Sequence, residues 1–118
     1  MSATTVILDQ GLVAEIRRIE QASGRDGIFA TCVRKLEQNL GEFRDAIATC
    51  VARGDTLGAV RAAHTLKGSC RQLGAQALGD LFASIERCVK EGDYAQAQRT
   101  FDGNAALVSD SLDALKRA

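Results

Sequence analysis

An unbroken helical repeat of apolar residues constrains the fold of this chain more than any other feature. The repeat advances in alternating steps of four and three residues through Phe29, Val33, Leu36, Leu40, Phe43, Ile47 and Cys50. This spacing places one apolar side chain on the same side of every helical turn, as in a helix that packs lengthwise in a bundle. The whole chain has 0 proline residues, so the commonest cause of a kink is missing. A long helix with one buried stripe is therefore predicted.

Similar stripes recur further along the chain. One comprises Phe101, Ala105, Val108, Leu112 and Leu115, and a shorter one comprises Leu78, Leu81, Phe82, Ile85, Cys88 and Val89. No segment alternates apolar and polar residues long enough to indicate a strand. Together these patterns predict helices over residues 9–22, 27–53, 56–73, 76–91 and 94–116.

The expected helices are separated by short turn signals. Gly54–Asp55 and Gly92–Asp93 each combine a glycine suited to a helix end with an aspartate suited to an N-cap, and Gly74 predicts a sharp turn. Asp9 is expected to cap the first helix, with Ile7 or Leu8 packing over it. Short loops make neighbouring helices antiparallel. The predicted fold is all-α: an antiparallel up-down four-helix bundle in one domain, residues 1–118, with an additional short N-terminal helix over one end and residues 1–8 as a flexible N-terminus.

Composition narrows the function classes. Apolar residues make up 46% of the 118 positions, and the 15 basic and 15 acidic residues cancel. A neutral chain lacks the field that attracts nucleic acid or an anionic membrane, so neither is an expected partner. The first residues resemble no secretion signal and no apolar run is long enough to span a bilayer, so a cytoplasmic protein is expected.

The four cysteines, Cys32, Cys50, Cys70 and Cys88, form no close-spaced pair. A structural zinc site usually needs such pairs, so no metal site is expected. Each cysteine falls on a predicted apolar stripe, where a thiol acts as a small hydrophobe. A redox-responsive bundle is the competing interpretation.

The helix predicted over residues 56–73 carries the only histidine, His64. On a helical wheel the apolar residues Ala59, Ala63, Leu66, Cys70 and Leu73 fall on the opposite side, so the imidazole should face solvent. The residues that share its face are Leu57, Val60, Lys67, Gly68 and Arg71.

These residue types suit nucleophilic chemistry at a protein–protein contact. An exposed imidazole has a free ring nitrogen near neutral pH, and Lys67 could hold an anion transferred to that nitrogen, with Arg71 reinforcing it. Gly68 costs about 1 kcal/mol in a helix interior relative to alanine. The benefit would be room for a partner to approach, while Leu57 and Val60 would supply apolar contact. Close helix packing at Gly68, and a merely solvated face at Lys67 and Arg71, are the competing interpretations.

The run Ala63-His64-Thr65-Leu66-Lys67-Gly68-Ser69-Cys70-Arg71-Gln72-Leu73-Gly74-Ala75 resembles the motif of histidine-containing phosphotransfer (HPt) domains. In that family the pattern reads His-x-Leu-Lys-Gly-Ser followed by Leu-Gly-Ala. The resemblance continues through Leu78, Leu81 and Glu86 and covers most of the chain from about residue 7.

The resemblance implies a monomeric four-helix bundle that relays phosphoryl groups in two-component signalling. His64 would accept the group from an aspartyl phosphate of a receiver domain, in a hybrid sensor kinase or a response regulator, and pass it to another receiver aspartate. Lys67 would stabilise the phosphate. Glu86 would hold the phosphoaccepting ring by accepting from Nδ1–H, which leaves Nε2 as the nucleophile; an ordinary surface glutamate is the competing interpretation.

The same resemblance implies a docking surface for the receiver. Its expected residues are Leu57, Val60, Arg61, Gly68 and Arg71, with Lys90 adding positive potential. The chain has no nucleotide-binding loop, so no autonomous kinase activity is expected, and Mg²⁺ would come from the receiver rather than from a cofactor site of its own. A non-catalytic module that binds or inhibits a receiver or kinase is the alternative function.

Overall fold

The computed structural model describes residues 7–25 and 27–118, and helices are the regular secondary structure of this part of the chain. The helices are α1 (Gln10–Ser23), α2 (Ile28–Ala52), α3 (Thr56–Gln72), α4 (Gln76–Lys90), α5 (Tyr94–Asp102) and α6 (Ala105–Arg117). The prediction of an all-α fold is confirmed. Residues 1–6 of the segment expected to be flexible lie outside the described residues.

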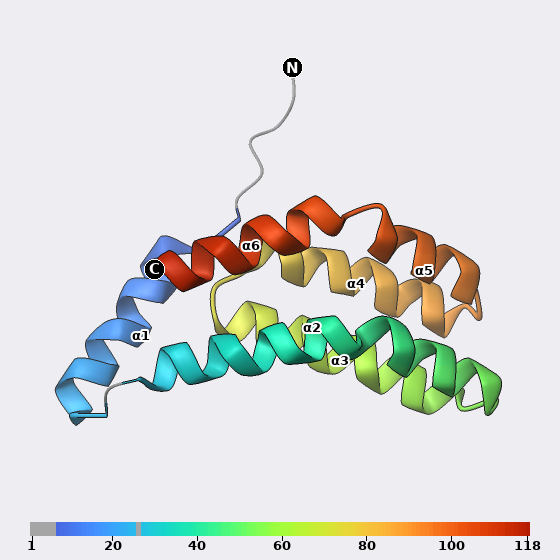
Figure 1. Ribbon diagram of the computed structural model, residues 1–118, viewed down its shortest axis with the longest axis horizontal. Helices are drawn as coiled ribbons and strands as arrows, with labels where there is room; N and C mark the ends of the chain where they lie inside the picture. Colours follow the sequence, from blue (N-terminus) through green and yellow to red (C-terminus); the bar gives the residue numbers. More distant parts are fainter. Residues whose placement is uncertain (1–6, 26) are drawn as a thin grey trace, which may run out of the picture.

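Successive long helices run back and forth beside one another (Figure 1). Helix α3 packs against both α2 and α4, α5 packs against α4, and α6 lies against α2 and α4. Helix α1 contacts α2 and crosses one end of the molecule. The seam between α3 and α4 lies behind α2 and α6 in Figure 1.

Aspartates begin three of the helices, as predicted. The Oδ1 atoms of Asp9, Asp55 and Asp93 accept backbone N–H groups of the first turns of α1, α3 and α5 at 3.0, 2.8 and 3.1 Å. Each bond satisfies a donor that has no partner within its own helix.

The predicted sharp turn at Gly74 joins α3 to α4. Its φ of +85° is strained for any residue with a Cβ atom. Its carbonyl accepts the backbone N–H of Asp9 at 2.6 Å, so the start of α1 is fixed to the α3–α4 turn. Leu8 is buried, which agrees with the expectation that Ile7 or Leu8 packs at the start of the first helix, so the placement of residue 8 in a flexible terminus is wrong.

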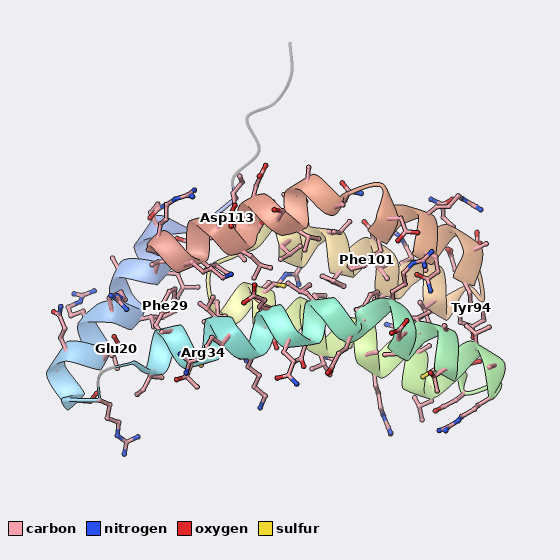
Figure 2. All side chains as sticks on the ribbon, in the orientation of Figure 1. Glu20, Phe29, Arg34, Tyr94, Phe101 and Asp113 are labelled. Carbon is pink, nitrogen blue, oxygen red and sulfur yellow. The ribbon has the colours of Figure 1, made fainter. Side chains whose placement is uncertain are left out.

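The other end of α1 is held by a buried carboxylate that the sequence analysis missed. Glu20 is 8% exposed, and its Oε2 accepts the backbone N–H of Phe29 in the first turn of α2 at 2.7 Å. Arg17 pairs with the other oxygen of Glu20 at 3.3 Å and lies 5.5 Å from the centre of the Phe29 ring. Figure 2 shows Glu20 and Phe29 near each other at this corner of the molecule. Gly27, the N-cap residue of α2, has no side chain to accept a backbone N–H, so Glu20 caps the start of α2 instead.

The prediction of a single last helix over 94–116 is wrong. Helix α5 ends at Asp102 and α6 begins at Ala105. The Asn104 side chain donates to the carbonyl of Thr100 at 2.7 Å, so it competes with continuation of α5. As a result the predicted stripe is displaced: Ala105 is exposed, while Ser111 is fully buried.

The core follows the long stripe of α2. Every member from Phe29 to Ile47 is at most 4% exposed, and Cys50 is half-buried. Phe43 meets Phe82 of α4 edge to face with ring centres 5.1 Å apart, and Phe101 of α5 lies 5.1 Å from Phe43. These aromatic pairs join three helices at one level of the core.

The cysteines do not all occupy that core. Cys70 is fully buried, and burial raises the pKa of its thiol to about 12, whereas Cys88 is half-buried. Cys32 is exposed, so its placement on a buried stripe is wrong. Its position, one residue before Val33, turns it away from the core.

Candidate functional site

Helix α3 separates its residues into a buried and an open face as the wheel predicted. Ala59, Ala63, Leu66 and Cys70 are buried, together with Leu73 at its C-terminal end. The His64 side chain, on the opposite face, is 65% exposed. The imidazole is therefore accessible from solvent.

Glu86 on α4 lies directly against this imidazole. Its Oε2 is 3.0 Å from His64 Nδ1, and the residue is only 5% exposed. Because a carboxylate accepts hydrogen bonds, the proton of the neutral ring is held on Nδ1, which donates to Glu86. Nε2 then carries the lone pair, and within the described part of the chain it has no hydrogen-bond partner. From the sequence alone, Glu86 could equally have been an ordinary surface glutamate, and its burial excludes that interpretation.

Two lysines share the same carboxylate. Lys67 Nζ donates to Glu86 Oε1 at 2.6 Å, and Lys90 Nζ lies 3.3 Å from Oε2. The hydrogen bond from Lys67 is the main reason that the pKa of Glu86 is lowered to about 2. Burial opposes this shift, and the hydrogen bonds from His64 and Lys90 lower the pKa to a smaller extent. Glu86 is thus an anion at neutral pH, with two lysine ammonium groups and the His64 imidazole beside it.

The two lysines differ in how firmly they are held. The Lys67 side chain is 21% exposed and bonded to Glu86, so the competing interpretation of a merely solvated side chain does not hold for it. Lys90 is 60% exposed and makes the longer contact. Both ammonium groups lie on the carboxylate that contacts Nδ1 of the ring.

The surface next to His64 is open on its glycine side. A Cβ atom at Gly68 would meet nothing within 4 Å among the described residues, so the alternative of close helix packing fails. Leu57 is 59% exposed and available for apolar contact. Val60 is half-buried against the core, so it is less available than expected.

The remaining docking candidates lie apart from Glu86. Arg61 is exposed on α3. Arg71 Nη2 lies 3.4 Å from Asp80 Oδ1 on α4, a partner that the sequence analysis did not identify. Arg71 therefore borders the site rather than joining the cluster around the ring.

Metal and membrane features are not found in the part of the chain that the structure covers. Over residues 7–25 and 27–118 no three His, Cys, Asp or Glu side chains converge as they would around a metal ion. Over the same residues, no helix combines the length and apolar character needed to cross a membrane.

Fold and site together define a helical protein that presents one histidine, oriented by a buried carboxylate, beside two lysines. The family model of the Hpt domain matches residues 27–118, and the chain belongs to this family. Hpt domains have a phosphotransfer role in two-component signalling, where they interact with receiver domains of sensor kinases or response regulators. Helix α1 precedes the matched region. Searches among curated proteins and among solved structures gave no match.

Proposed function

We propose that this protein carries a phosphoryl group on His64 between the aspartates of two receiver domains in the cytoplasm. The observation that carries the proposal is the hydrogen bond from Nδ1 to the buried Glu86, with Nε2 directed away from it. In a neutral ring with this tautomer, Nε2 carries the lone pair and is exposed to solvent. Nε2 can therefore act as a nucleophile without a separate base to remove a proton from it.

The proposed step is a displacement at phosphorus. The Nε2 lone pair forms a bond to the phosphorus of an aspartyl phosphate, the bond from phosphorus to the aspartate oxygen breaks, and the aspartate leaves as a carboxylate. The ring keeps its proton on Nδ1 and becomes cationic, and the adjacent Glu86 anion stabilises this charge. The reverse step on a second receiver aspartate restores neutral His64.

Lys67 and Lys90 are proposed to stabilise the phosphorylated state. A phosphoryl group carries about 1.5–2 negative charges at neutral pH. Both ammonium groups already lie on Glu86, and Lys90 in particular is loosely held, so each can reach toward an anion on Nε2. Lys67 would then share its charge between the carboxylate and the phosphate.

Gly68 and Leu57 are proposed to admit and contact the receiver. The chain acts as a monomer in this account, and Mg²⁺ in the receiver neutralises charge on the transferring group. The chain supplies the nucleophile, its orientation and two nearby cations.

The test mixes the protein with receiver domains of its source organism, phosphorylated by a small-molecule phosphoryl donor in the presence of Mg²⁺. Wild-type protein should acquire an acid-labile, base-stable phosphate. His64→Gln should acquire none, while Gln38→Ala, at an exposed position of α2, serves as the matched control and should label normally. Circular dichroism confirms that both variants are folded.

Label that persists in His64→Gln, or wild-type protein that no receiver labels, would contradict the proposal. Binding of a receiver without any transfer would favour the non-catalytic alternative instead.

A further inference from the structure

Gly79, in the interior of α4, is a position where an added side chain has no room. A Cβ atom there would lie 2.7 Å from Arg71 Cγ, 3.3 Å from Nε and 3.6 Å from Cδ. These are atoms along the Arg71 side chain rather than its far end, so any residue other than glycine would force Arg71 into another rotamer. Glycine weakens a helix interior relative to alanine, and here it creates the groove in which the arginine stem lies.

Asp80, the next residue of α4, contacts the charged end of that arginine. Its Oδ1 lies 3.4 Å from Arg71 Nη2, and the two side chains are 68% and 50% exposed. A guanidinium has five N–H donors in a rigid fork, so one long contact to Asp80 leaves most of its donors for a partner. Arg71 is thus held across the α3–α4 seam with its charged end still accessible.

The place of Arg71 fits a contact with a partner rather than with the transferred phosphate. It follows His64 by seven residues on α3, about 10 Å along the helix axis, and it pairs with Asp80 instead of Glu86. Although the whole chain is neutral, α3 contains Arg61, Lys67 and Arg71 and no acidic residue. Lys67 is neutralised by Glu86, but Arg61 and Arg71 are exposed, and exposed cations favour a partner surface of opposite charge.

We propose that Arg71 selects among receiver domains by pairing with a carboxylate on the partner's docking surface, and that Gly79 and Asp80 are positioning residues that hold it ready. The proposal rests on the proposed phosphotransfer function. Because Arg71 acts on docking, its loss changes KM for the phosphorylated receiver and not kcat. Because the contact is between exposed charges, its effect shrinks as salt is added.

The experiment measures initial rates of transfer from the receiver that labels His64 fastest, at increasing receiver concentration. Arg71→Ala should raise KM about three- to tenfold at low salt with kcat nearly unchanged. Gly79→Ala, which keeps the charge but displaces the side chain, should raise KM in the same direction. In the Arg71→Ala background, Gly79→Ala should add nothing.

Two control variants make the same kinds of substitution at exposed positions of α2, away from the Arg71 side chain. Gly41→Ala places the same substitution at an exposed helical glycine of α2 where a Cβ atom meets nothing within 4 Å among the described residues. Arg34→Ala removes an exposed arginine from the same helix. Both should leave KM unchanged.

An unchanged KM in Arg71→Ala at low salt, or a Gly79→Ala effect that is as large without Arg71 as with it, would overturn the proposal. Both results leave His64 labelling intact, so they are distinct from failure of the phosphotransfer function, in which no receiver labels the wild-type protein.

Discussion

The charge of Glu86 makes a pH-dependent contribution to stability that one substitution isolates. Its pKa falls from an ordinary 4.5 to about 2 in the folded protein, chiefly through the hydrogen bond from Lys67. A carboxyl with a depressed pKa stabilises the fold fully above its unfolded pKa, and that contribution is lost as the pH falls toward the folded pKa. The window is therefore pH 4.5 down to about 2.

The magnitude follows from the same two values. Each pKa unit corresponds to 1.36 kcal/mol, so a shift from 4.5 to about 2 contributes about 3 kcal/mol at neutral pH. The side chain is 6% exposed, so solvent screens this interaction little. Glu86→Gln keeps the shape and removes the charge, and it should abolish this part of the pH dependence.

The assay is urea unfolding followed by far-ultraviolet circular dichroism, for wild-type protein and Glu86→Gln, in steps from pH 6.5 to about 2.5. Other carboxyl groups titrate in both proteins, so the difference between their unfolding free energies isolates Glu86. That difference should shrink by about 1 kcal/mol per pH unit below pH 4.5. Two curves that stay parallel through the window would refute the assignment of Glu86 as a buried anion.

Three further substitutions test the open and the buried face of α3. Lys67→Ala removes the 2.6 Å donor to Glu86 and should lower the free energy of unfolding, measured by urea unfolding, by about 1.5–3 kcal/mol. It should also shorten the lifetime of the phosphorylated protein, measured by loss of label. Unchanged stability would contradict the ion pair. Gly68→Gln should slow phosphoryl transfer because the new side chain blocks the receiver domain. The fold should be at least as stable, because a Cβ atom added at this position meets no described residue within 4 Å. Unaltered transfer rates would show that the receiver does not need the space at Gly68. Leu66→Ala should lower the free energy of unfolding by about 2–5 kcal/mol, because the side chain is 3% exposed and its loss leaves a cavity in the core. A loss near zero in urea unfolding would contradict that role of Leu66 in the core.

The long helices were predictable from sequence because their register depends on local spacing. The stripe from Phe29 to Ile47 and the opposition of His64 to Ala63 and Leu66 both follow from 3.6 residues per turn. The aspartate caps follow from the chemistry of a single side chain at each helix start.

Features that depend on packing between helices were not predictable in the same way. The burial of Glu86 arises because α4 lies along α3, and the same packing covers Lys67 and Val60 more than a lone helix would. Gly103 and Asn104 are residues that can break a helix, but the apolar spacing continues across them, so periodicity alone predicts one helix there. Glu20 reaches the start of a neighbouring helix, and no periodicity within α1 indicates that contact.

The most direct test of this account is the position of the phosphate on the imidazole ring. After transfer from a phosphorylated receiver, ¹H–¹⁵N and ³¹P NMR distinguish substitution at the two ring nitrogens. Because Glu86 occupies Nδ1, the account predicts phosphate on Nε2 of His64. Phosphate on Nδ1, or on any residue other than His64, would contradict it.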